Sequence, residues 1–170
     1  MPYPKLDAAG NPILPRYIPE LKLIDFEERL VSGDLTADGV QYSSEVTSGG
    51  ADAWTDALSK IIDPDIDGDL LWAELGLTAE FQQLNGTTTL TWQWQARNKD
   101  GTWVDLHTEV TESANTITSY TARTRQGFNK KTNFDAVPCE VKLRFKTSEA
   151  NQGKAKVKSS SYVRVVYKAT

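Results

Sequence analysis

The chain has 170 residues, a net charge of −4 and an apolar share of 39%, which suit one globular domain with a sizeable core. It contains no run of about 18 apolar residues and no basic-then-apolar start, so we expect neither a membrane span nor a secretory signal. A single cysteine, Cys139, and a single histidine, His107, weigh against a disulfide, a Cys/His metal centre and a Ser-His-Asp catalytic site.

The charge is divided unevenly along the chain. Residues 1–120 carry −13, whereas residues 121–170 carry +9. Such a split favours contacts between unlike surfaces of neighbouring subunits or of a partner. The alternative is that the two halves interleave in the fold and largely neutralise each other.

Residues 1–19 contain five of the seven prolines. Proline lacks the backbone donor that helices and central strands need, so this segment is predicted to be an extended arm outside a single domain of residues 20–170. A loose terminus is the alternative. Apolar side chains argue that the arm docks on another surface, and they are Tyr3, Ile13, Leu14, Tyr17 and Ile18.

The next segments alternate between strand and loop patterns. Residues 20–30 predict a first strand with Ile24 and Phe26 on one face, and residues 32–50 predict a loop with a short strand near residues 40–42. In residues 51–62 the spacing changes to three and four, which predicts a short helix capped by Asp52. The residues of its apolar face are Ala51, Trp54, Ala57, Leu58, Ile61 and Ile62.

Residues 70–84 fit both a helix and a strand. We favour a strand because Gly76 would weaken a helix, and its expected inner face is Leu71, Ala73, Leu75, Leu77, Ala79 and Phe81.

A central hairpin is predicted over residues 90–106. Leu90, Trp92, Trp94 and Ala96 alternate with polar residues, which indicates a half-buried strand. Asp100-Gly101 then supplies the residues of a tight turn.

Three later strands are predicted at residues 115–124, 137–145 and 157–168. Between them we expect a polar loop at residues 125–136, with Phe128 and Phe134 exposed, and a connection at residues 148–156. The chain is therefore predicted to be all-β: an antiparallel β-sandwich or jelly roll of about seven or eight strands, with one short helix and the N-terminal arm.

An acidic motif follows the predicted helix. Residues 63–74 match the spacing of an EF-hand calcium loop, in which carboxylates at alternate positions converge on a hard cation. Leu71 and Ile66 depart from that pattern, and no partner loop is present. The alternative is an acidic turn. The candidate calcium ligands are Asp63, Asp65, Asp67 and Glu74.

Two surface features suggest binding. Trp103 is the tryptophan expected to be exposed, and flat aromatic rings can stack on sugars, although core packing is the alternative for Trp92 and Trp94. Lysines and arginines at residues 142–146 and 154–158 alternate with apolar residues. They predict either a basic face for nucleic acid or, as we favour, a solvated outer face.

The hairpin motif, Trp92-Gln-Trp94-Gln followed by Asp100-Gly101-Thr-Trp103, resembles the immunoglobulin-like repeats of bacteria and phages, without their second cysteine. In overall character the chain also resembles small β-sandwich structural proteins of viruses and tailed phages, including capsid decoration proteins. Those shared features are the arm, the Thr-rich strands, the scarcity of Cys and His, and the basic C-terminal strands.

The viral resemblance implies a non-enzymatic virion structural protein, a capsid decoration or minor capsid subunit made in the host cytoplasm. Its partners would be other virion subunits, such as the major capsid protein, and further copies of itself, with no nucleic acid, membrane or cofactor. The alternative is a carbohydrate- or receptor-binding sandwich of the tail-fibre or adhesin type, with Trp103 as the ligand-binding residue.

Overall fold

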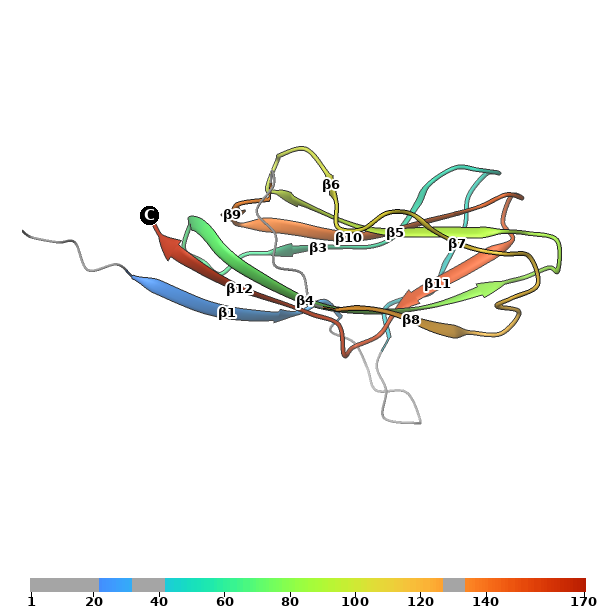
Figure 1. Ribbon diagram of the computed structural model, residues 1–170, viewed down its shortest axis with the longest axis horizontal. Coiled ribbons are helices and arrows are strands. Elements are labelled where there is room, and N and C mark those ends of the chain that lie inside the picture. Colours follow the sequence, from blue (N-terminus) through green and yellow to red (C-terminus); the bar gives the residue numbers. More distant parts are fainter. Residues whose placement is uncertain (1–21, 32–41, 127–133) are drawn as a thin grey trace, which may run out of the picture.

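The computed structural model describes residues 22–31, 42–126 and 134–170. Two antiparallel sheets lie face to face in two layers (Figure 1), which confirms the predicted all-β sandwich. The larger sheet contains β1 (Leu23–Arg29), β2 (Val46–Thr47), β4 (Gly68–Gln83), β8 (Thr121–Gln126), β9 (Ala136–Val137), β11 (Gly153–Val157) and β12 (Tyr162–Ala169). The smaller sheet contains β3 (Thr55–Ile62), β5 (Leu90–Asn98), β6 (Val104–Asp105), β7 (Val110–Glu112) and β10 (Cys139–Thr147).

Each sheet is four strands wide, because some of its short strands lie end to end along the same edge of a neighbouring strand. β11 and β12 run consecutively along one edge of β4, with Ala155 opposite Phe81 and Val165 opposite Ala73. β8 and β9 share the other edge of β4, while β1 and β2 share the outer edge of β12 and β11. In the smaller sheet the order is β3, β10, β5, and then β6 with β7.

The core follows from the alternation of side chains along the central strands. Trp92 and Trp94 of β5 and Leu143 and Phe145 of β10 are at most 1% exposed, and they point at β4 across the interior. Phe81 of β4 stacks on Trp92 with 5.3 Å between ring centroids. Cys139 is also buried, and burial raises the pKa of its thiol to about 12.

The predicted helix at residues 51–62 is wrong, because residues 55–62 form strand β3, and the described part of the chain contains no helix. The cause is a β-bulge. Leu143 pairs with Leu58, but the next residue of β10, Arg144, pairs with Asp56, so Ala57 is an extra residue. One extra residue shifts the period of two and produces apolar spacings that imitate a helix.

A second bulge explains the ambiguity of residues 70–84, which form β4 as predicted. Tyr167 pairs with Leu70 and Val166 with Trp72, so Leu71 is the extra residue. As a result Leu70 is buried and Leu71 is 39% exposed, although Leu71 was expected on the inner face.

Other expected elements shift in their bounds. The strand expected at residues 115–124 begins only at Thr121. Asn115 adopts a positive φ, and the backbone of residues 113, 116 and 117 bonds to the Gln83 side chain rather than to a partner strand. The expected connection at residues 148–156 contains the start of β11. Phe134 is 2% exposed rather than exposed as expected, whereas Phe128 lies outside the described residues. No helix among the described residues is long and apolar enough to cross a membrane.

An ion pair joins the two sheets at each open side of the sandwich. Lys60 of β3 contacts Glu28 of β1 at 2.9 Å on one side. Arg123 of β8 contacts Glu112 of β7 through two hydrogen bonds of 2.6 and 2.7 Å on the other side. The Arg123 guanidinium holds the pKa of Glu112 below its usual value.

Replacing Leu143 tests the core. We expect Leu143→Ala to lower the free energy of unfolding by about 2–5 kcal/mol, because the side chain is fully buried between the sheets. The matched control is Leu84→Ala, which removes a side chain that is 43% exposed and should cost less than about 1 kcal/mol. Urea unfolding of both variants provides the measurement, and equal losses would contradict this core.

Candidate functional site

The outer face of the smaller sheet is covered by polar side chains rather than open to solvent. Gln93 and Gln95 of β5 point away from the core, yet they are only 1% and 5% exposed. The Gln93 amide donates to the backbone oxygen of His107 at 2.9 Å and accepts from Arg144 Nε at 3.1 Å. Gln95 donates to Asp105 at 2.6 Å. The side-chain amides of this layer are therefore hydrogen-bonded to neighbouring side chains and backbone groups.

Trp103 lies on this layer. Arg97 and Lys142 approach its ring centroid to 4.5 and 4.3 Å, within the range of cation–π contacts. The side chain remains partly exposed, in contrast to Trp92 and Trp94. The sequence-based separation of Trp103 from the two core tryptophans is therefore reproduced in the structure.

Trp54 lies on the same outer face, which the sequence analysis missed. Its ring centroid is 4.1 Å from the Arg144 guanidinium and 4.7 Å from Lys146 Nζ. The sequence pattern placed Trp54 on the apolar face of a helix, and it therefore did not predict that Trp54 lies just before strand β3. The signal available in the sequence was the alternation of Lys142, Arg144 and Lys146, which marks the outward side of β10.

On the edge of β5 that β6 and β7 share, no residue of a described strand pairs with Trp94, and the His107 side chain takes the place of the missing backbone acceptor. The Trp94 N–H donates to His107 Nε2 at 3.0 Å, and His107 Nδ1 lies 2.6 Å from the Thr108 backbone oxygen. The network therefore requires a neutral ring with its proton on Nδ1. Burial and the nearby Arg125 guanidinium lower the pKa of His107, against the opposing effects of the Thr108 bond and of Asp105.

The two basic rows do not form one face, contrary to the basic-face alternative. Lys142, Arg144 and Lys146 lie on the outside of the smaller sheet, while Lys154 and Lys156 lie on the outside of the larger sheet. Each row is matched by carboxylates from the acidic part of the chain. The pairs include Lys142–Asp56, Lys154–Glu45, Lys156–Glu80 and Arg164–Asp25. The halves of the chain therefore interleave and neutralise each other, as one of the two interpretations predicted.

The candidate calcium ligands are not brought together. Asp63, Asp65 and Asp67 lie at the β3–β4 turn, whereas Glu74 lies within β4 and accepts a hydrogen bond of 2.8 Å from the Tyr162 hydroxyl. Among the described residues, no group of three or more His, Cys, Asp or Glu side chains could hold a metal ion. The continuation of the motif into a strand, rather than into a helix, explains the failure. The predicted arm residues, Tyr3, Ile13, Leu14, Tyr17 and Ile18, lie outside the described residues.

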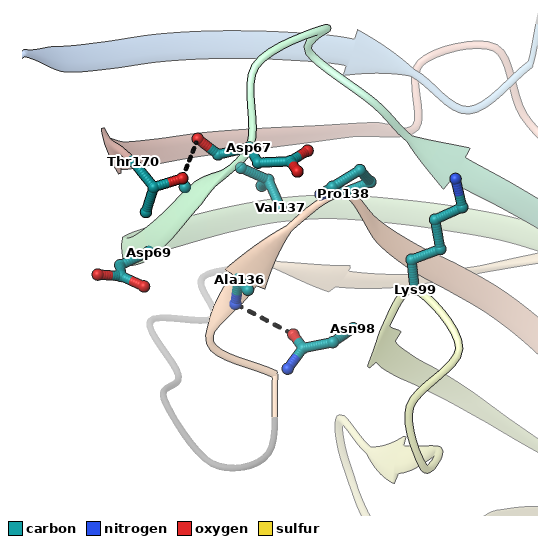
Figure 2. Close-up of a pocket in the computed structure, with 9 residues that line it drawn as sticks. Asp67, Asp69, Asn98, Lys99, Ala136, Val137, Pro138 and Thr170 are labelled. Atoms are coloured by element: carbon teal, nitrogen blue, oxygen red, sulfur yellow. Dashed lines mark hydrogen bonds between the residues drawn. The ribbon is translucent and has the colours of Figure 1, made fainter.

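A pocket of about 300 Å³ opens at the end of the sandwich where β4 begins and β5 ends (Figure 2). Asn98 accepts a hydrogen bond of 3.0 Å from the Ala136 N–H, and the Asp67 backbone oxygen accepts from Thr170. The pocket is lined by two exposed carboxylates and one exposed amine, which belong to Asp67, Asp69 and Lys99. Such solvated groups suit polar contact with a partner better than acid–base chemistry, which needs a shielded pair.

No protein-family model and no curated protein matches the chain. Among solved structures, the VP2 subviral particle of infectious bursal disease virus is similar with a TM-score of 0.42 and 15% identity, over 88% of this chain and 33% of that chain. The T13 particle of the same virus gives a TM-score of 0.44 and 13% identity, over 87% and 36%. A CocE/NonD family hydrolase from Staphylococcus aureus gives 0.37 and 9%, over 85% and 36%.

This chain thus spans about a third of the length of those solved chains. The matches include proteins of virus particles, but they lend no support to the tailed-phage part of the expected resemblance. At these TM-scores none of them identifies a function, so the function has to be inferred from the geometry of this chain.

The environment of His107 predicts a pH dependence. Because its pKa is lower in the folded than in the unfolded chain, the unfolded chain binds more protons between those two values. Stability should therefore fall as the pH drops below about 6.5 and through the folded pKa. Urea midpoints measured from about pH 7.5 to about pH 5 should decline more for the wild type than for His107→Gln, which keeps an acceptor but cannot titrate. Parallel declines would contradict this role.

Proposed function

We propose that this chain is a non-enzymatic structural protein of a virus particle, a capsid decoration or minor capsid subunit. It would act through contacts with other virion subunits, such as the major capsid protein, and with copies of itself. The proposal includes its production in the host cytoplasm, which accords with the buried free thiol of Cys139.

The observation that carries the proposal is the order of the strand positions. Counted along the chain, the eight strand positions are β1 with β2, β3, β4, β5, β6 with β7, β8 with β9, β10, and β11 with β12. In this count the larger sheet has the order one, eight, three, six, and the smaller sheet has the order two, seven, four, five. This order supports a jelly roll, an architecture found in viral capsid and lectin domains. Bulky side chains fill the space between the sheets, so the interior serves packing and function is left to the surface.

The arm is the proposed assembly element. Residues 1–19 carry Tyr3, Ile13, Leu14, Tyr17 and Ile18, which would bury apolar area on a neighbouring subunit. Many such contacts around a shell would add up through multivalency, while unlike charges set the register of the subunits.

Deleting residues 1–19 tests this proposal. We expect the circular dichroism spectrum to stay unchanged, because the buried core lies among residues 30–167. The deletion should abolish incorporation into particles or reduce the solution mass to that of a monomer, measured by sedimentation and light scattering. Full assembly by the shortened chain would argue against the arm's role.

Trp54 and Trp103 favour a second candidate function, the binding of a glycan. Both rings are partly exposed on the same outer face, and cations occupy the space against them. The remaining ring surface would stack on a sugar, and carboxylates such as Asp105 nearby would accept hydrogen bonds from its hydroxyl groups.

A glycan array distinguishes this candidate. If a glycan binds this face, Trp103→Ala and Trp54→Ala should each weaken binding by about tenfold or more without unfolding the chain. Trp72→Ala is the matched control, because Trp72 is a partly exposed tryptophan on the larger sheet. Equal effects of all three replacements, or no array signal, would eliminate the candidate.

A further inference from the structure

An apolar patch lies on the outer surface of the larger sheet beside the start of β1. Leu23 and Leu71 are 54% and 39% exposed, and Trp72 and Val166 are partly exposed between them. The strand register joins these four residues, because Val166 pairs with Trp72 on one side and with Asp25, two residues after Leu23, on the other. We call Leu23, Leu71, Trp72 and Val166 the outer patch.

Unpaired negative charge borders the outer patch. Asp69 lies opposite Lys168 in the register without forming an ion pair, and no described residue binds the carboxylate of Asp69 or Asp67. Asp63 and Asp65 add two further carboxylates, against which this end offers the exposed Lys99 and Lys168. The outer patch therefore suits an apolar segment that carries a cation.

The arm of this protein has that composition. In its sequence Arg16 stands between Ile13-Leu14 and Tyr17-Ile18. The arm also joins the fold at the outer patch, because β1 begins with Leu23 itself. Figure 1 shows that the start of β1 and the end of β12 lie at the same end of the sandwich.

Geometry favours a neighbour's arm over the chain's own arm. Strand β1 begins beside the outer patch at Leu23 and runs from there toward Arg29. To lie on its own patch, residues 13–18 would have to reverse direction within the few residues that precede Leu23. Pro12, Pro15 and Pro19 favour extended backbone, and about 20 extended residues span roughly 65 Å. In extended form a segment of that length would be long enough to reach another subunit.

We propose that the outer patch receives the arm, residues 1–19, of a second copy, with Arg16 of that copy beside Asp69 and its apolar neighbours against Leu71 and Leu23. This inference rests on the proposed function, in which the arm is the assembly element, and it names the arm's partner and docking surface.

The test uses full-length chains. A photoreactive benzoylphenylalanine replaces Tyr17, and copies labelled with 15N and with 14N are mixed before illumination. We expect crosslinks between heavy and light copies that map to β4 or β12 near the outer patch. Arg16→Asp and Asp69→Arg should each reduce this yield by about tenfold, because like charges would meet, and the double variant should restore it.

Glu109→Arg is the control, since it reverses an exposed carboxylate just before β7, 4.0 Å from Lys146 of the smaller sheet, and should leave the yield unchanged. Melting temperatures of all variants show that each remains folded. Crosslinks within one isotope only, crosslinks to another surface, or no restoration in the double variant would overturn the inference. Particle incorporation that survives deletion of residues 1–19, despite crosslinks between copies, would instead refute the proposed function alone.

Discussion

Packing of aromatic side chains between the two sheets is the interaction on which the rest of the structure depends. Phe81 stacks on Trp92 across the interior and also lies 6.4 Å from Phe145, so β4, β5 and β10 are tied together at one point. These are the central strands of their sheets, and the remaining strands pair with them or with their neighbours. The inter-sheet ion pairs, Lys60–Glu28 and Arg123–Glu112, lie at the margins of this core and close its sides.

The sequence predicts those strands whose alternation is unbroken. β5 and β10 were predicted with the correct buried faces, because one side of each strand packs and the other carries polar residues. β3 was mistaken for a helix and Leu71 was given the wrong face, because an extra residue at Ala57 or Leu71 reverses the alternation partway along a strand. A bulge is fixed by the partner strand, which lies far away in sequence, and local periodicity therefore cannot reveal it.

The candidate site was predicted only where local pattern sufficed. Trp103 follows a turn and was separated correctly from Trp92 and Trp94, whereas its neighbour Trp54 reaches the same face from a strand almost 50 residues earlier. The calcium site predicted from the acidic motif of residues 63–74 is not formed, because the fold of the following residues decides where the ligands lie. The spacing of the motif matched a calcium loop, but residues 68–83 form a strand, and Glu74 lies within that strand rather than at the turn that contains the three aspartates.

The pairing of charges across the chain bears on where this protein would bind others. On both outer faces several basic side chains of the last 50 residues pair with carboxylates of the preceding part, as Lys156 does with Glu80 and Arg164 with Asp25. A partner that displaced those contacts would have to replace the interactions that it broke. At the β3–β4 end, by contrast, the carboxylates of Asp67 and Asp69 have no partner among the described residues and lie beside the exposed side chain of Leu71. Association there would break few existing contacts, so physical reasoning favours this end, together with the outer patch of the larger sheet that borders it, over the neutralised remainder of both faces.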